Sequence, residues 1–171
     1  MGVRLIAGRA GSGKTHWCLS RIQEALAASR VEGPRLGLHV CRGNWSRQED
    51  VLLTGDYERL LPAFTKIRVK QFVLEYATPR AGDVHVVGKA LADREIGLGV
   101  VNPRTAEPES VEEIVAKAEQ ALKYYRPEQM FLNPDCGFGC FANRCVNEEE
   151  VAVKKIHRIT QAAAVLKEKH A

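Results

Sequence analysis

The sequence predicts an α/β fold in which short strands alternate with longer helices. Two observations carry this prediction: apolar runs of strand length recur about every 25 to 35 residues, and amphipathic segments fill the intervals between them. We expect strands at residues 3–7, 36–41, 71–76, 96–101 and 129–132. We expect helices at residues 16–29, 56–64, 84–93, 111–125 and 148–169.

The start of the fourth expected helix carries its own signal. Ser110 precedes the apolar run that begins at Val111, and Glu113 follows three residues later, which is the pattern of a capping box. A weak break at residues 30–35 (RVEGPR) is the one plausible junction between two unlike pieces. We therefore divide the chain into a first segment, residues 1–32, and a main segment, residues 33–171.

Composition excludes several classes of function. The 171 residues include 25 Lys and Arg against 21 Asp and Glu, and the resulting charge of +4 is spread along the chain. We therefore expect no nucleic-acid partner, because such a surface needs clustered basic and aromatic residues. No apolar stretch approaches the length of roughly 20 residues that spans a membrane, and no cleavable leader is evident. We expect a cytoplasmic protein without a membrane partner.

The first segment contains a complete phosphate-binding loop motif, G-x-x-x-x-G-K-T, between an apolar strand and a helix. In such loops the backbone cradles phosphates, the Lys reaches the β and γ oxygens and the Thr holds Mg²⁺. The motif resembles the opening of ATP-dependent helicase–nuclease subunits and makes ATP with Mg²⁺ a candidate ligand. Its nucleotide-binding residues would be Gly8, Gly11, Gly13, Lys14 and Thr15.

In the main segment, the ends of three expected strands carry metal-binding residue types. His39 and Cys41 lie two positions apart and so point to the same side of a strand. Glu75 ends the next strand, and Cys136 follows the last. Carboxyl ends of parallel strands meet on one face, where imidazole, thiolate and carboxylate form a plausible zinc set. The alternative is that His39 and Cys41 are ordinary strand-end residues of the core.

Four stretches of the main segment resemble the C-terminal catalytic domain of cobalamin-independent methionine synthases. They are GLHVCRGNWSRQED, FVLEYATPRAGD, GLGVVNPRTAEPESVEEIV and FLNPDCGFG. The resemblance implies zinc held by His39, Cys41, Glu75 and Cys136. It also implies a (β/α)₈ barrel, of which this chain has about the last four βα units. The first segment adds one extra βα unit before them, which carries the phosphate-binding loop.

The same resemblance implies methyl transfer from 5-methyltetrahydrofolate to the sulfur of homocysteine, a step of methionine biosynthesis. Zinc would convert the acceptor thiol into a reactive thiolate. Relatives place a proton-donating His after the third strand, but Arg104 stands there, and Arg is not an acid near neutral pH. No catalytic residue is therefore assigned. Zinc-dependent alkyl transfer to another small thiol, such as coenzyme M, is an alternative.

Two further alternatives follow from the first segment and from the missing half of a barrel. The chain could be an ATP-binding protein that uses Lys14 with Glu75, or an inactive fragment that works only with a partner. Loss of zinc on changing Cys136 would favour the zinc-dependent methyltransferase. Loss of Mg²⁺-dependent ATP hydrolysis on changing Lys14 would favour the ATP-binding protein. Because half a barrel leaves two open sheet edges, we predict that the chain either forms a homodimer that completes the barrel or is marginally stable.

Overall fold

The computed structural model describes residues 36–44, 46–48, 52–139 and 145–170. All of them lie in the unit Arg35–Ala171. The first segment, with the predicted phosphate-binding loop and its strand and helix, lies outside the described residues. None of the helices formed by the described residues is long and apolar enough to span a bilayer.

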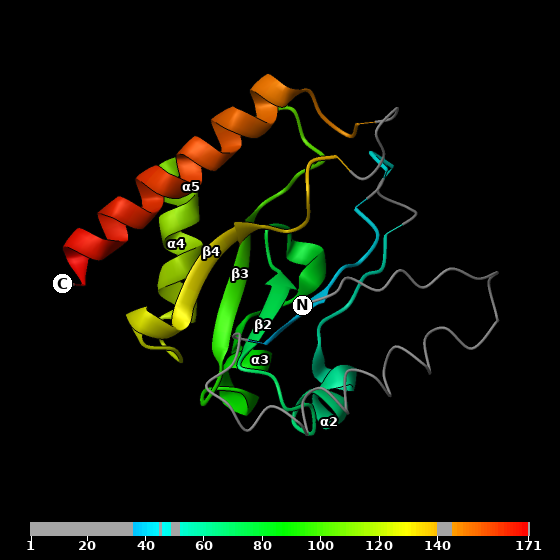
Figure 1. Cartoon of the computed structure of the whole chain (residues 1–171), viewed down its shortest axis with the longest axis vertical. Coiled ribbons are helices and arrows are strands. Elements are labelled where there is room, and N and C mark those ends of the chain that lie inside the picture. The colour runs from blue at the N-terminus through cyan, green and yellow to red at the C-terminus, as the bar shows by residue number, and fades with distance from the viewer. Residues whose placement is uncertain (1–35, 45, 49–51, 140–144, 171) are drawn as a thin grey trace, which may run out of the picture. The chain divides into compact units, whose positions relative to one another are not determined.

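Four parallel strands form a single sheet in the order in which they occur in the chain (Figure 1). They are β1 (Gly37–Val40), β2 (Gln71–Glu75), β3 (Glu95–Val101) and β4 (Met130–Pro134). Each pairs in parallel with its neighbours. The strands predicted in the main segment are thus confirmed, and because they are parallel, their carboxyl ends all lie at the same end of the sheet.

Helices follow the strands as βα units require. They are α2 (Leu61–Phe64), α3 (His85–Ala90), α4 (Val111–Ala121) and α5 (Glu149–Lys169), with 3-10 turns η1 (Glu58–Leu60), η2 (Pro79–Ala81) and η3 (Pro127–Gln129). Figure 1 shows α4 and α5 lying together beside β3 and β4. The predicted capping box is present: the Ser110 hydroxyl accepts from the Glu113 amide, and the Glu113 carboxylate accepts from the Ser110 amide.

The helix expected at residues 56–64 is shorter than predicted. The described backbone makes a 3-10 turn, Glu58–Leu60, and then a single α-helical turn, Leu61–Phe64. Pro62 lies in the first turn of that helix, where its missing N–H costs nothing. A helix running from residue 56 would instead place Pro62 in its interior and lose a hydrogen bond there. The proline therefore sets where the α-helix begins.

The apolar core is centred on β3, whose seven residues are all buried. β1 and β4 are the two edge strands of the described sheet. Beside β4 lies an apolar hollow of about 570 Å³, lined by residues of β4, η3 and α5. The Phe131 side chain on β4 is 38% exposed. The described residues therefore form an open parallel sheet, as expected for a partial barrel, and the completion of that barrel stays a prediction.

Candidate metal centre

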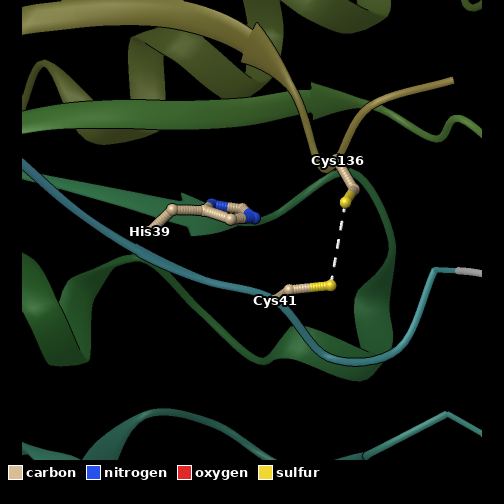
Figure 2. Close-up of side chains that lie close together, drawn as sticks. All are labelled: His39, Cys41 and Cys136. Carbon is tan, nitrogen blue, oxygen red and sulfur yellow. Dashed lines mark hydrogen bonds between the residues drawn. The ribbon is translucent and has the colours of Figure 1, made fainter. Parts of the chain in front are cut away.

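Three potential metal ligands come together at the carboxyl ends of the two edge strands. His39 lies at the end of β1, Cys41 directly follows it, and Cys136 follows β4. One ligand atom from each lies within 4.8 Å of the others. The sulfur atoms of Cys41 and Cys136 are 3.7 Å apart. Figure 2 shows the His39 ring directed toward the two sulfur atoms.

The His39 ring is oriented by the neighbouring strand. Its Nδ1 lies 3.1 Å from the carbonyl oxygen of Val73 on β2. A carbonyl oxygen only accepts, so this contact requires the proton on Nδ1 and directs Nε2 away from the strand backbone as the atom that can bind a metal. Metal-binding histidines are commonly held in this way by a backbone carbonyl. The geometry therefore suits His39 to bind an ion through Nε2.

Glu75, the fourth residue predicted to bind metal, lies at the end of β2 with its side chain fully buried. Its Oε1 accepts from the Arg42 amide at 2.7 Å and from Asn44 Nδ2 at 2.6 Å. Its Oε2 forms an ion pair with Arg80 at 3.1 Å. The group of ligand atoms within 4.8 Å does not include this carboxylate. The ligand role of Glu75 therefore stays a prediction. Its hydrogen bonds with Arg42 and Asn44 do fix the segment that follows β1.

Two residues in this network, Asn44 and Arg80, were not singled out from the sequence. Asn44 is fully buried, and its Oδ1 accepts from Arg80 Nη2 at 3.3 Å and from Arg104 Nε at 3.0 Å. Both residues lie within stretches that carry the family resemblance, but a single amide or guanidinium in a loop gives no signal of burial. Their importance becomes evident only when the strand ends are assembled around Glu75.

Arg104 is buried in the loop that follows β3. Lys155 of α5 is fully buried. Its amine donates hydrogen bonds to the Thr105 hydroxyl, the Glu107 carbonyl and the Glu109 carboxylate, and these bonds fix the loop against α5. Through Asn44, the Arg104 guanidinium belongs to the same network as Glu75. A permanently charged group thus stands where the resemblance expects a proton-donating histidine.

Asp135 is the second buried carboxylate at this end of the sheet, and sequence reasoning missed its role. Its Oδ1 accepts from the amides of Tyr76 and Ala77, each at 2.9 Å, at the end of β2. Burial raises the pKa of Asp135 to about 7, although the two backbone amides oppose that shift. The only sequence signal was its place beside Cys136 in the turn.

The donor set fits zinc. Two thiols and an imidazole that can converge within bonding reach are typical zinc ligands, and a catalytic zinc site keeps a further position for water or substrate. His39 and Cys41 are exposed, and Cys136 is partly exposed, so a small thiol can approach the cluster. Of the other two cysteines after Cys136, Cys145 is exposed and Cys140 lies outside the described residues.

Fold and site together define an α/β protein whose candidate metal centre lies at the carboxyl ends of parallel strands. Residues 36–164 match the family described as the catalytic domain of cobalamin-independent synthase. Because this match covers most of the chain, the chain belongs to that family.

Named relatives agree with this assignment. The chain is 35% identical over 127 residues to the methionine synthase of Pyrococcus abyssi, covering 74% of this chain and 34% of the relative. It is 40% identical over 103 residues to that of Pyrococcus horikoshii, covering 60% and 27%. Each of these matches spans about a third or less of the relative.

A solved structure supports the fold. The chain superposes on a B12-independent methionine synthase from Shewanella sp. W3-18-1, solved in complex with selenomethionine. The TM-score is 0.70 at 16% identity, and the match covers 92% of this chain and 45% of the other. At this identity the likeness establishes the fold. It agrees with a sheet that forms part of a larger barrel.

Proposed function

We propose that the chain binds zinc through His39, Cys41 and Cys136, with Glu75 as a fourth ligand, and takes part in methyl transfer to a thiol. The observation that carries the proposal is the cluster of three soft donors inside the region that matches the family. The reaction is the one that the family resemblance implies: the methyl group of 5-methyltetrahydrofolate moves to the sulfur of homocysteine.

Each residue of the centre has a definite task in this proposal. Zinc, when bound, supplies a Lewis acid that keeps an incoming thiol deprotonated and therefore nucleophilic. Cys41 and Cys136 present thiols from opposite edges of the sheet, and the Val73 carbonyl fixes the tautomer and orientation of His39. Arg104 offers positive charge near the site but cannot donate the proton that the leaving tetrahydrofolate nitrogen requires.

The same proposal includes a partner, because β1 and β4 are both edge strands of the described sheet. The chain spans about a third of the relatives that it matches. We infer that a second copy of the chain places its β1 edge against β4, so that two open sheets close into one barrel. The exposed Phe131 and the apolar hollow beside β4 would then be covered. Such an arrangement removes both open edges, which are otherwise sites of unspecific pairing.

Zinc content is the first test. The purified chain should contain about one zinc per chain by mass spectrometry of the metal, as expected for a single site. Cys136→Ser should lose it, and Glu75→Gln tests the fourth ligand in the same way. Cys145→Ser is the matched control, since Cys145 is an exposed cysteine outside the cluster, and it should keep the metal. Equal zinc in the Cys136 and Cys145 variants would overturn the proposed centre.

Transfer of a labelled methyl group is the second test. We expect label from 5-methyltetrahydrofolate to reach homocysteine, with a rate per chain that increases with protein concentration as the dimer forms. Coenzyme M in place of homocysteine tests the alternative acceptor. Zinc binding without transfer to either thiol at any concentration would leave a metal-binding fragment and exclude activity of this chain on its own.

A further inference from the structure

The two thiols of the centre come from strands that are not neighbours. β1 and β4 are separated by β2 and β3, and three strand spacings in a sheet amount to roughly 14 Å. The sulfur atoms of Cys41 and Cys136 are nevertheless 3.7 Å apart. The chain beyond each edge strand must therefore lean inward over the ends of the two central strands. Something has to hold it there.

The segments that follow β1 and β4 are both hydrogen-bonded to the end of β2. On one side, the Glu75 carboxylate accepts from the Arg42 amide and from Asn44, which draws the chain after β1 onto β2. On the other side, the amides of Tyr76 and Ala77 donate to Asp135 Oδ1. Asp135 directly precedes Cys136, so the position of this carboxylate governs where the second thiol lies.

Gly99 leaves the room that this arrangement needs. To reach the end of β2, the Asp135 side chain must pass across β3, and it does so at Gly99. A Cβ atom on Gly99 would overlap Asp135 Oδ1 and would lie 2.8 Å from the Leu74 carbonyl oxygen. The pairing of β3 with β4 shifts register between Gly99 and Val101, and the Val101 carbonyl accepts from the Asp135 amide. Any side chain at position 99 would require Asp135 or the backbone at the end of β2 to move.

We propose that Asp135 and Gly99 form a positioning pair that sets the distance between Cys41 and Cys136 and thereby the affinity of the centre for zinc. Asp135 acts through Cys136, as hydrogen-bonding partners outside a metal centre commonly do. Its relevance to zinc rests on the proposed function. The geometric part, that the pair holds the two thiols together, holds for the metal-free protein as well.

Three variants test the pair. Asp135→Leu removes the acceptor for the Tyr76 and Ala77 amides and should weaken zinc binding about 10- to 100-fold, the usual effect of losing such a partner. Asp135→Asn keeps an oxygen that can accept both amides and should restore most of the affinity. Gly99→Ala should weaken binding like Asp135→Leu. Gly137→Ala is the matched control, because its added Cβ would meet nothing within 4 Å.

Zinc affinity is measured by competition with a chromophoric chelator, and the absorption of the cobalt(II) form reports whether both thiolates bind. Circular dichroism confirms that each variant is folded. If Asp135→Leu does not fold, Asp135→Glu takes its place: it keeps the carboxylate but lengthens the side chain by one methylene, and it should still weaken binding. Native affinity and a native cobalt spectrum in folded Asp135→Leu or Asp135→Glu would overturn the proposal.

A measurement without metal separates this proposal from the proposed function. Diamide oxidises two thiols to one disulfide, taking up two electrons and two protons as it becomes a hydrazine. In the metal-free wild type, the Cys41–Cys136 disulfide, mapped by peptide mass spectrometry, should form at least about 10-fold faster than in Asp135→Leu or Gly99→Ala, because thiol exchange depends on access and approach. If the wild type binds no zinc, the proposed function fails, but this difference in rate still decides the role of the pair. Equal rates would overturn it.

Discussion

The chain beyond β1 and the chain beyond β4 each bring a thiol to the same place, but different groups hold them. Beyond β1, Glu75 takes hydrogen bonds from a backbone amide and from Asn44, and an ion pair with Arg80 balances its charge. Beyond β4, Asp135 takes only backbone amides among the described residues. The first arrangement depends on paired charges and the second on exact placement of one carboxylate.

The segments that follow β1 and β4 should therefore lose their positions in different ways. A buried ion pair is costly to break from one side, because the remaining charge is left without compensation. Loss of Arg80 should therefore lower the free energy of unfolding, because it removes the charge partner of Glu75 on the β1 side. Asp135 forms no ion pair among the described residues, and Arg80 acts on it only as a weaker, longer-range charge. The β4 side should therefore respond mainly to shape, and Gly99 is the position where a Cβ atom would overlap the carboxylate.

The largest effect is expected from Arg80→Met. This change leaves the fully buried Glu75 carboxylate without its cation and should lower the free energy of unfolding by about 4 kcal/mol. Urea denaturation followed by circular dichroism measures it. Lys169→Met, which breaks the exposed pair with Glu119, is the control and should cost less than about 1 kcal/mol. Similar losses in the two variants would contradict the view that the Glu75 pair organises the β1 side.

Lys155→Met should cause a somewhat smaller loss of stability. Lys155 bonds the loop after β3, which contains neither of the two thiols. The buried amine bonds Thr105, Glu107 and Glu109, so its removal should lower the free energy of unfolding by about 3 kcal/mol. Zinc stoichiometry at low temperature should stay the same as in the wild type. Loss of zinc from the folded variant would mean that the loop after β3 also supports the centre.

Adding zinc should stabilise the wild type by about 2.7 kcal/mol when free zinc is about 100 times its dissociation constant. Thermal melting with and without zinc measures the shift. His39→Ala removes the imidazole of the centre and should abolish most of the shift, whereas His157→Ala, at an exposed position on α5, should keep it. A shift of wild-type size in His39→Ala would mean that the ion binds elsewhere.

The smallest effect on stability is expected from Phe131→Asp. The side chain is partly exposed on the β4 edge, so the free energy of unfolding of the monomer should change by less than about 1 kcal/mol. Self-association, measured by analytical ultracentrifugation, should weaken about 10-fold or more because the charge would be buried in the dimer. Val153→Asp on the exposed face of α5 is the control. Equal dissociation constants in the two variants would exclude β4 as the interface.

Much of the fold could be predicted from local pattern. The apolar runs at β1 to β4 and the capping box at Ser110 act over a few residues, and the structure confirms them. The helix at residues 56–64 was predicted too long, because the pattern of apolar residues does not register the effect of Pro62. Residues 1–35 are outside the described residues, so the phosphate-binding loop with Lys14 remains a prediction.

The residue types at the strand ends follow from the amino-acid sequence alone: His39 lies near the end of β1, Cys41 directly follows β1, and Cys136 follows β4. The tertiary structure alone decided what holds them. The bonds from Asn44 to Glu75, from the Tyr76 amide to Asp135 and from Lys155 to Glu109 each join residues that lie tens of positions apart along the chain. Such contacts depend on strand order and sheet curvature, which long-range packing sets. No local pattern in the sequence encodes that a glycine on β3 makes room for the aspartate that directly follows β4.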